Sequence, residues 1–566
     1  MAKKIEGKNG QTIIVPVEKR SALLPMLQKV QEKKGYISDK DMQEIADRLR
    51  IHPVEVYSVV TFYSFLNAEK KGKHIIRVSN CMPNELAGSH RIINAFEKAL
   101  KIKCSETTKD GKVTLEMTGC IGMCDKAPAV MVDDLLVGNV TPKTVSEIVK
   151  CFKSGKKLEV KNTSDKIKRD GPIVFSPIGP YEGLKKAVEL GRSEVLDVVR
   201  GSNLKGRGGA GFPVGVKWNL TATASSDKKF VVCNADEGEP GTFKDKVLLE
   251  EYLPLVLEGM VIAGFAVGSD TGFLYLRGEY KCMVPHIEKT LAKFRSAGML
   301  GRNIMGRDGF NFDINIRMGS GAYVCGEETA LIESLEGNRG EPRNKPPFPV
   351  NTGYTGYPTT VNNVETFASV VHIMAKGADW FKKTGTEKSS GSKLISVSGD
   401  CGKPGVYEVP FGTSIAEILK LTGAKNVKAV QVGGAAGSCV PKKDFNKKLG
   451  YEDLSTGGSI MIFGAKRKML DAAENFLRFF KEESCGQCTP CRQGVPVFLE
   501  GVKAVKKGEC SASYMKDLMS LSETMQVASK CGLGQAASTA FMSIIKNFPN
   551  EYKLSNKSKK EMKFNG

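Results

Sequence analysis

Four cysteines near the carboxyl end restrict what this chain can fold into more than any other feature of the sequence. Three of them lie in the run Cys485-Gly-Gln-Cys488-Thr-Pro-Cys491, and the fourth is Cys531. Three thiols at this spacing with a distant fourth are typical of a [4Fe–4S] cluster, whereas tetrahedral zinc usually takes cysteines as separate pairs. A turn of small residues with incidental thiols is the alternative, but exposed free thiols are reactive. The sequence therefore predicts a chain that transfers single electrons.

The composition is that of a soluble globular protein. Of the 566 residues, 41% are apolar and 26% are charged, which is ordinary for folded domains. A chain of this length divides into about three to five domains. Because no apolar run reaches about 18 residues and no signal peptide is evident, we expect a cytoplasmic protein without direct membrane insertion. The 15 cysteines then indicate metal ligation in preference to disulfides.

The net charge of +21 does not indicate nucleic-acid binding. The lysines are scattered, and the chain has neither a basic helix with base-reading residues nor an aromatic–glycine RNA motif. We therefore expect no nucleic-acid partner. A solvated surface explains most of the charge, and a docking face for an acidic partner subunit is the alternative. Residues 551–566 have the composition of a basic, unstructured tail.

The order of patterns predicts a multidomain α/β protein. Helical periodicity over 21–70 predicts a helical bundle, and strand-like runs around a helix at 90–100 predict a small α/β unit. From about 170 to 393, short β-branched strands alternate with helices, which indicates a mostly parallel sheet. A β-rich piece and a helical bundle that carries the four cysteines follow. The predicted domain boundaries are 1–72, 73–158, 170–393, 394–465, 466–550 and 551–566.

A glycine-rich segment lies near the start of the predicted parallel-sheet part. It reads Gly206-Arg-Gly-Gly-Ala-Gly-Phe-Pro-Val-Gly215 and is followed by Lys217. Closely spaced glycines let backbone N–H groups approach a phosphate, and Arg207 and Lys217 add positive charge. A mobile surface turn is the alternative. The segment is a candidate phosphate-binding loop.

Further segments place polar groups beside predicted strand ends and helix starts. Residues 234–245 follow a strand with carboxylates and an amide suited to ribityl or ribose hydroxyls, although an acidic helix cap is the alternative. Residues 319–329 again place glycines before a helix, 343–349 offer a cation and an aromatic ring for an adenine nucleotide, and 359–366 add two amides. Together with the glycine-rich segment they predict a pocket for a flavin and a dinucleotide.

In this order, these segments and the cysteine motif resemble the FMN- and NADH-binding flavoprotein subunit of respiratory complex I and of NAD-linked hydrogenases and formate dehydrogenases. The resemblance covers about 170–548. It implies a Rossmann-like FMN/NADH domain, a ubiquitin-like β-grasp insert and a C-terminal helical bundle with a [4Fe–4S] cluster. The implied cluster ligands are Cys485, Cys488, Cys491 and Cys531.

The resemblance also implies which residues hold the flavin and the nucleotide. The implied FMN contacts are Gly206, Arg207, Gly208, Gly209, Ala210, Gly211, Phe212, Lys217, Asn234, Asp236, Glu327, Asn362 and Asn363. The implied NADH contacts are Phe212, Lys217, Glu239, Glu328, Lys345 and Phe348. From the same segments we add Glu237, Tyr323 and Gly326 as cofactor contacts. We expect Lys217, Glu237 and Glu327 to be the catalytic positions.

Residues 20–158 resemble a different subunit of the same enzymes, the small partner with a helical bundle and a thioredoxin-like [2Fe–2S] domain. Here the two subunits look fused. The partner subunit uses C-x4-C and C-x3-C, but this chain keeps only Cys81, Cys120 and Cys124 and has Leu86 in the remaining position. Leucine cannot ligate iron, so we expect an altered site: empty, labile, or a [2Fe–2S] cluster with a non-standard fourth ligand. The candidate fourth ligands are Glu85, Asn84 and Cys104.

One function accommodates these implications. NADH gives up two electrons as a hydride, iron–sulfur clusters accept one electron at a time, and a flavin can connect the two. We expect a diaphorase subunit that oxidises NADH, or reduces NAD+, through FMN and passes electrons through the [4Fe–4S] cluster. The expected partners are an [FeFe] hydrogenase-type or formate dehydrogenase-type catalytic subunit and further iron–sulfur subunits. The alternatives are an electron-bifurcating flavoprotein, a peripheral-arm subunit of complex I, and a zinc-stabilised scaffold or nucleic-acid binder.

Overall fold

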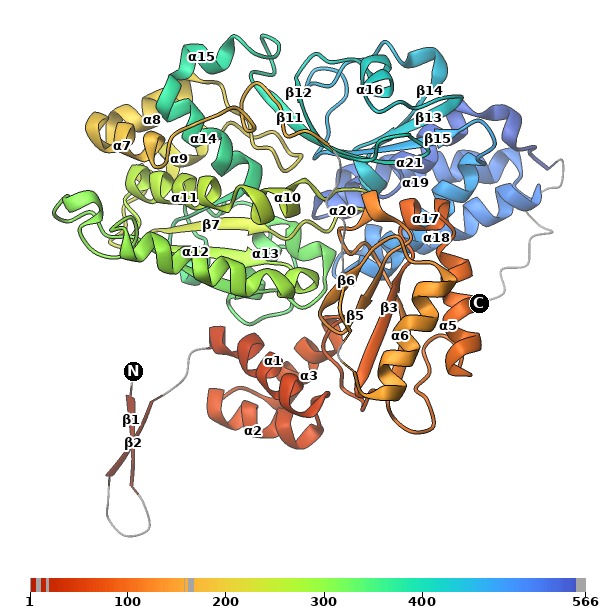
Figure 1. Ribbon diagram of the computed structural model, residues 1–566, viewed down its shortest axis with the longest axis horizontal. Helices are drawn as coiled ribbons and strands as arrows, with labels where there is room; N and C mark the ends of the chain where they lie inside the picture. Colours follow the sequence, from red (N-terminus) through yellow and green to blue (C-terminus); the bar gives the residue numbers. More distant parts are fainter. Residues whose placement is uncertain (1, 7–11, 17–19, 157, 161–166, 556–566) are drawn as a thin grey trace.

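The computed structural model describes residues 2–6, 12–16, 20–156, 158–160 and 167–555. At the N-terminus, β1 (Ala2–Glu6) and β2 (Thr12–Pro16) pair as an antiparallel hairpin, which Figure 1 shows apart from the helices. The helical pattern at 21–70 does not indicate this hairpin. Residues 556–566 of the predicted basic tail lie outside the described residues.

Three short helices follow the hairpin: α1 (Leu23–Lys34), α2 (Asp39–Leu49) and α3 (Pro53–Phe62). A capping box starts α2, because the Ser38 hydroxyl accepts the Asp41 N–H and the Asp41 carboxylate accepts the Ser38 N–H. The apolar faces of these helices share a core with side chains of the large parallel sheet, and Figure 1 shows them at the lower edge of the molecule. The N-terminal helices therefore cover one face of that sheet.

The thioredoxin-like unit has a four-stranded sheet in the order β4-β3-β5-β6. The strands β3 and β4 run parallel, and the remaining pairs are antiparallel. Its elements are β3 (His74–Ser79), α4 (Met82–Leu86), α5 (Ser89–Leu100), β4 (Val113–Thr118), β5 (Val130–Val132), β6 (Leu135–Val137) and α6 (Pro142–Ser154).

The largest unit contains a fully parallel sheet in the order β10-β7-β8-β9. Side chains alternate along β7: Val231 and Cys233 point into the core formed with helices α11 and α14, whereas Val232 points toward the N-terminal helices. Helices thus cover both faces. The elements are α7 (Glu182–Leu190), α8 (Arg192–Gly201), α9 (Val214–Thr223), β7 (Phe230–Ala235), α10 (Lys244–Glu251), α11 (Leu253–Val267), β8 (Thr271–Leu276), α12 (Val284–Ser296), β9 (Asp313–Met318), α13 (Glu328–Leu335), β10 (Thr359–Asn363), α14 (Val364–Lys376) and α15 (Ala378–Lys382).

A five-stranded β-grasp unit follows, in the order β12-β11-β15-β13-β14. Only β11 and β15 are parallel. The elements are β11 (Ser392–Gly399), β12 (Gly405–Pro410), α16 (Ile415–Leu421), β13 (Val427–Val432), β14 (Ser438–Pro441) and β15 (Ser459–Gly464).

The C-terminal part is a helical bundle, which Figure 1 places between the β-grasp unit and the thioredoxin-like unit. It consists of α17 (Met469–Glu483), α18 (Thr489–Lys507), α19 (Ala512–Ala528), α20 (Gly532–Ala536) and α21 (Thr539–Asn547). The fold class predicted from the sequence is confirmed, while the domain boundaries stay a prediction. Among the described residues, no helix is long and apolar enough to cross a bilayer.

Candidate active site and metal centres

The parallel sheet brings the predicted flavin residues together at one edge. The chain passes from β7 through β8 to β9 in one direction and adds β10 on the other side of β7, so the strand order reverses between β7 and β10. Ligands of open α/β sheets bind at such a reversal of strand order. The register places Asn363 opposite Asn234. The two amide-bearing segments therefore meet in space, as a shared pocket requires.

Asn234 and Asp236 are fixed at the end of β7. Asn234 Nδ2 donates to the carbonyl oxygen of Gly326 at 2.8 Å, and Asn234 Oδ1 accepts the Asp236 backbone N–H at 3.1 Å. Asp236 Oδ2 is buried without a hydrogen-bond partner in the described part of the chain, and burial raises the pKa of this carboxyl well above its usual value. Buried polar atoms normally have partners, so this oxygen fits a donor on a flavin ring or a ribityl chain.

Two lysines and two glutamates form a charged cluster next to the glycine-rich segment. Lys217 Nζ lies 2.9 Å from Glu328 Oε2 and 3.2 Å from the Val361 carbonyl oxygen. Lys345 Nζ lies 2.6 Å from Glu327 Oε1 and 3.6 Å from Glu328 Oε1. Burial raises the pKa of Glu328, but the two lysines outweigh it and hold the pKa below its usual value. Two distant segments thus supply cations that a nucleotide's phosphates can approach.

Two aromatic rings beside this cluster are unusually exposed. Phe212 is 48% exposed and Phe348 is 50% exposed. Lys217 Nζ lies 5.9 Å from the centre of the Phe212 ring. Exposed phenylalanines cost hydrophobic free energy unless a ligand covers them. Both rings are therefore candidates to stack on a base or a nicotinamide.

Glu239 and Tyr323 form a half-buried, hydrogen-bonded pair. The Tyr323 hydroxyl donates to Glu239 Oε2 at 2.6 Å, and Glu239 Oε1 accepts the Ala436 N–H at 3.2 Å. Burial raises the pKa of Glu239 to about 7. Tyr323 and Asp236 also line a polar cavity with about 340 Å³ of empty space. This cavity adjoins the predicted nucleotide pocket.

A loop of the β-grasp unit covers the glycine-rich segment. The Tyr451 hydroxyl donates to the Gly206 carbonyl oxygen at 2.8 Å. A Cβ at Gly211, whose φ is +68°, would lie 2.4 Å from a carbon of the Tyr451 ring, so only glycine fits there. Gly208 and Ala210 are exposed, and Gly209 has a φ of +125°. The segment is thus fixed by Tyr451 at Gly206 and Gly211, and it is open to solvent at Gly208 and Ala210.

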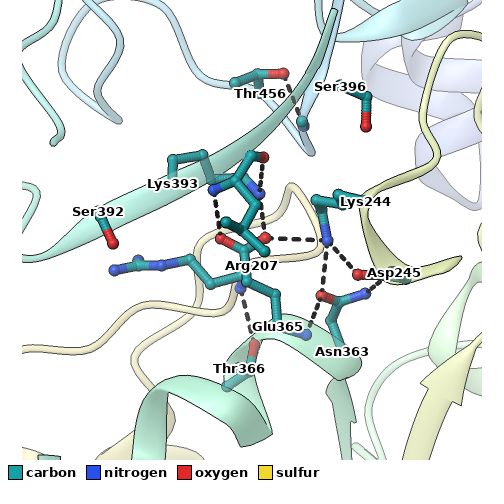
Figure 2. Close-up of polar contacts among 12 residues, drawn as sticks. Arg207, Lys244, Asp245, Asn363, Glu365, Thr366, Ser392, Lys393, Ser396 and Thr456 are labelled. Atoms are coloured by element: carbon teal, nitrogen blue, oxygen red, sulfur yellow. Dashed lines mark hydrogen bonds and ion pairs between the residues drawn. The ribbon is translucent and has the colours of Figure 1, made fainter. Parts of the chain in front are cut away.

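Arg207 does not supply the positive charge expected of it. Its guanidinium donates to the carbonyl oxygens of Lys205 at 3.0 Å and Ser390 at 2.8 Å, and it lies 4.8 Å from the centre of the Phe411 ring. Figure 2 shows this side chain pointing away from Lys244. Because the guanidinium is buried between backbone carbonyls and aromatic rings, it is unavailable to a phosphate.

Lys244 is a buried cation in direct contact with one of the predicted flavin amides, that of Asn363. Its Nζ lies 2.5 Å from Asp245 Oδ1, 3.0 Å from Glu365 Oε2 and 3.0 Å from Asn363 Oδ1. Asn363 Nδ2 in turn donates to Asp245 Oδ2 at 2.6 Å, and the bond network is visible in Figure 2. On the neighbouring residue, Asn362 Oδ1 accepts the Trp218 indole N–H at 2.8 Å. Both amides are therefore held in fixed orientations.

Glu237 occupies a position different from the catalytic one we expected. Its carboxylate accepts the N–H groups of Asp245 at 2.8 Å and Lys246 at 3.2 Å at the start of α10, and the Tyr280 hydroxyl at 3.0 Å. Burial raises its pKa to about 8. Both carboxylate oxygens are engaged, so the contacts favour the acidic helix cap over a catalytic group.

The four cysteines of the C-terminal motif surround a second cavity, with about 280 Å³ of empty space. Cys485, Cys488 and Cys491 reach it from the start of α18, and Cys531 reaches it from the residue before α20. The Ser484 hydroxyl lies 3.2 Å from Cys491 Sγ. Four thiols around one mainly apolar cavity are the donor set of a [4Fe–4S] cluster.

The three N-terminal cysteines form a compact group. Cys81 Sγ is 3.8 Å from Cys124 Sγ, Cys120 Sγ is 3.3 Å from Cys124 Sγ, and all three lie within 4.8 Å of one another. Among the described residues, no other cysteine, histidine or carboxylate joins this group. Leu86 packs against the core of the C-terminal bundle. The four-thiolate donor set of a [2Fe–2S] cluster is therefore incomplete here.

Three family models match successive parts of the chain. A thioredoxin-like [2Fe–2S] ferredoxin matches residues 11–153, a Nuo51 FMN-binding domain matches 199–372, and the iron–sulfur binding region of NADH-ubiquinone oxidoreductase-F matches 471–555. The NAD-reducing hydrogenase HoxS subunit alpha of Cupriavidus necator is 40% identical over 551 residues, covering 94% of this chain and 92% of that protein. The chain belongs to the NADH-oxidising flavoprotein family of NAD-reducing hydrogenases and NADH–quinone oxidoreductases.

Two further relatives agree with this assignment. A subunit of the NADH-quinone oxidoreductase of Rhizobium meliloti is 39% identical over 387 residues, covering 66% of this chain and 91% of that protein. A crystal structure of an NAD+-reducing [NiFe]-hydrogenase in the H2-reduced state superposes with a TM-score of 0.89 at 32% identity, covering 95% of this chain and 94% of that chain. Membership makes this chain an FMN-dependent, iron–sulfur oxidoreductase subunit, as the sequence predicted.

Several residues that organise the site were missed from the sequence alone. Arg277 Nη2 donates to the Cys120 carbonyl oxygen at 2.6 Å, another of its nitrogens donates to the Glu237 carbonyl oxygen, and Glu279 pairs with it at 2.7 Å. Tyr451 and Lys244 were not singled out either. Arg277 directly follows β8. A charged pair at the carboxyl end of a parallel strand is a sequence pattern that could have indicated its place at the site.

Proposed function

We propose that this chain is the diaphorase subunit of a cytoplasmic NAD-reducing hydrogenase. The observation that carries this proposal is the short turn Tyr323–Gly326. Tyr323 lines the polar cavity that adjoins the predicted nucleotide pocket, and the next residue, Val324, lines the cavity of the four cysteines. One turn of chain therefore separates the place of hydride chemistry from the place where single electrons leave.

In this proposal, the charged cluster and the exposed rings hold the nucleotide. Lys217 and Lys345 attract its phosphates, Phe212 and Phe348 cover its rings, and Glu328 orients both lysines through its ion pairs. When bound, FMN accepts the two electrons of a hydride and releases them singly. No proton relay is required, and histidine is absent from the contacts described above.

On the flavin side, Asn234, Asp236, Asn362 and Asn363 bind and orient the cofactor. The Asp236 oxygen that lacks a partner accepts from it, whereas Lys244 and Asp245 fix the Asn363 amide. Glu239 and Tyr323 close the pocket toward the cluster. Because this carboxylate–phenol pair is half-buried, its hydrogen bond is stronger than the same bond in bulk water.

The partner is proposed from the extent of the similarity. The relative from Cupriavidus necator is named an NAD-reducing hydrogenase subunit, and similarity to it spans the fused N-terminal part as well as the flavoprotein part. The solved relative is of the [NiFe] type, so we propose a [NiFe] rather than an [FeFe] catalytic subunit, with further iron–sulfur subunits. A formate dehydrogenase, a bifurcating complex and a complex I arm are the remaining candidates.

Replacing one cluster ligand tests this function. In Cys491→Ser, NADH should still reduce an artificial dye that accepts from the flavin, because the nucleotide pocket is untouched. Electron delivery to the co-purified partner subunits should fail, because the four-cysteine cavity loses a ligand. Cys510→Ser, which removes a buried thiol outside that cavity, is the matched control. Undiminished turnover with the natural partner in Cys491→Ser would refute the proposed route.

A further inference from the structure

The N-terminal cysteine trio has the dimensions of a site for one metal ion. A metal with bonds of about 2.3 Å to sulfur and tetrahedral geometry holds its thiolates about 3.8 Å apart. The observed separations are 3.8 Å for Cys81 and Cys124 and 3.3 Å for Cys120 and Cys124, with the third pair inside 4.8 Å. All three sulfurs can therefore bind the same ion.

A two-iron cluster needs a different arrangement. Each of its irons takes two protein ligands, so the four donors fall into two pairs at opposite ends. Here, Cys120 and Cys124 form one pair, but Cys81 lies 3.8 Å from Cys124, so it is placed as a third ligand of the same metal. Leu86 has no donor atom for the second iron, and its side chain packs against the apolar core of the C-terminal bundle.

The three alternative ligands considered from the sequence are all engaged elsewhere. The Asn84 amide oxygen accepts the Ala129 N–H at 2.7 Å, and its nitrogen faces Cys81 Sγ at 3.2 Å as a donor. The Glu85 carboxylate pairs with Arg478 at 3.5 Å. Cys104 lies outside the group of sulfurs. None of the three completes a four-ligand set for two irons.

The surroundings of the trio suit thiolates. The Asn84 amide nitrogen donates to Cys81 Sγ at 3.2 Å, and its amide oxygen is held by the Ala129 N–H. The Ser79 oxygen lies 3.5 Å from the same sulfur, but its single proton is directed at the Gly119 carbonyl oxygen at 2.8 Å. Such outer donors orient metal-bound sulfurs. The three cysteines are 3–4% exposed. A shared metal ion accounts for the close approach of their three sulfurs, which free thiols do not require.

We infer that Cys81, Cys120 and Cys124 bind a single divalent ion of the zinc class through three thiolates, in place of a [2Fe–2S] cluster. The fourth position has no protein ligand among the described residues and is left to a small ligand such as water. Cys120 borders the polar cavity next to the flavin site, which gives a water access to the ion.

Metal and acid-labile sulfide counts on the full chain, prepared without oxygen, test this inference. The acid-labile sulfide gives the amount of iron held in clusters. After that iron is subtracted, we expect one zinc or iron ion per chain to remain. Cys124→Ser should lose that ion with the sulfide unchanged, whereas Cys104→Ser, from the same unit but outside the trio, should keep it. If Cys124→Ser does not fold, the counts on the unaltered chain decide alone.

A gain-of-function variant provides a second measurement. Leu86→Cys restores the missing donor, so after incubation with iron and sulfide and reduction with dithionite it should gain the electron paramagnetic resonance signal of a reduced [2Fe–2S] cluster that the unaltered chain lacks. The inference is overturned if the unaltered chain already shows that signal, if its sulfide exceeds that of the [4Fe–4S] cluster and falls in Cys124→Ser, or if the trio binds no metal at all.

Discussion

Lys217 joins three elements around the proposed nucleotide site. It lies on α9, yet its ammonium group contacts Glu328 at the start of α13 and the backbone of Val361 on β10. Its side chain is only 17% exposed, so its charge is weakly screened by solvent. A residue placed in this way both holds the pocket together and presents a cation to a ligand.

Removing that charge should weaken nucleotide binding. A hydrogen bond to a charged group contributes about 1.5–3 kcal/mol, so Lys217→Met should raise KM for NADH roughly tenfold to a hundredfold. Stopped-flow or steady-state dye reduction measures this. Lys289→Met, which removes an exposed lysine on α12, should leave KM unchanged. A normal KM in Lys217→Met would remove this lysine from the nucleotide site.

The resemblance brought together charged residues that lie close in the structure, while their role in binding NADH stays a prediction. Lys217, Glu328 and Lys345 meet in one cluster, although only the family resemblance connected them. Sequence reasoning misjudged Arg207 and Glu237, because the direction of a side chain depends on tertiary partners that the local sequence does not contain. The Arg207 guanidinium finds the Ser390 carbonyl 183 residues away, and no local pattern predicts that contact.

At the scale of elements, the glycine-rich segment depends on the β-grasp loop above it. Gly211→Ala should displace Tyr451, because the added Cβ would lie 2.4 Å from the ring, and it also strains a backbone with a φ of +68°. We expect the variant to lose FMN on gel filtration. Gly309→Ala carries the same strain, with a φ of +72°, but its Cβ would meet no atom within 4 Å. Equal FMN loss in both variants would show that strain alone is responsible.

Helices α7 and α11 are joined by a carboxyl whose protonation makes stability depend on pH. Glu258 on α11 accepts the Leu184 N–H at 2.9 Å, and burial raises its pKa from 4.5 to about 7. The folded state thus binds this proton more tightly than the unfolded state. The stability it contributes is fully present below 4.5 and is lost as the pH rises through about 7.

Glu258→Gln should therefore flatten the dependence of stability on pH over this window. A shift of this size corresponds to about 3 kcal/mol at most, which unfolding by denaturant at a series of pH values can resolve. Glu288→Gln on the exposed face of α12 is the control and should keep the slope of the unaltered chain. An unchanged slope in Glu258→Gln would mean that the carboxyl is already ionised when buried.

At the scale of the whole molecule, local patterns predicted the units but not how they pack. One of the strand-like runs predicted around the helix at 90–100 is found as β3 (His74–Ser79), where β-branched residues alternate with polar ones from Ile76 to Ser79. In contrast, no pattern in the sequence indicated that the N-terminal helices cover the flavin-domain sheet. That contact is made by side chains such as Tyr63, whose hydroxyl donates to Ser334 Oγ at 2.8 Å, and it depends on shape rather than on periodicity.

One buried ion network connects the flavin domain to the β-grasp unit. Glu365 at the start of α14 pairs with Lys393 on β11 and lies 3.0 Å from Lys244 on α10, and its Oε1 accepts the Leu394 N–H at 2.8 Å (Figure 2). All three charged side chains are at most 1% exposed. Although burial raises the pKa of Glu365, the two lysines outweigh it and hold that pKa below its usual value.

Lys393→Met should destabilise the chain by about 3–5 kcal/mol, since removing one partner of a buried pair leaves the other charge uncompensated. Lys244 still contacts Glu365 and Asn363, so the loss should fall at the lower end of that range, and FMN should remain bound. Denaturant unfolding of Lys393→Met, Glu365→Met and the double variant forms a mutant cycle. Because replacing both partners with apolar groups leaves no unpaired charge, the double variant should be more stable than the sum of the single losses predicts. Strict additivity would show that the two side chains do not act as a pair and that other contacts hold the two units together.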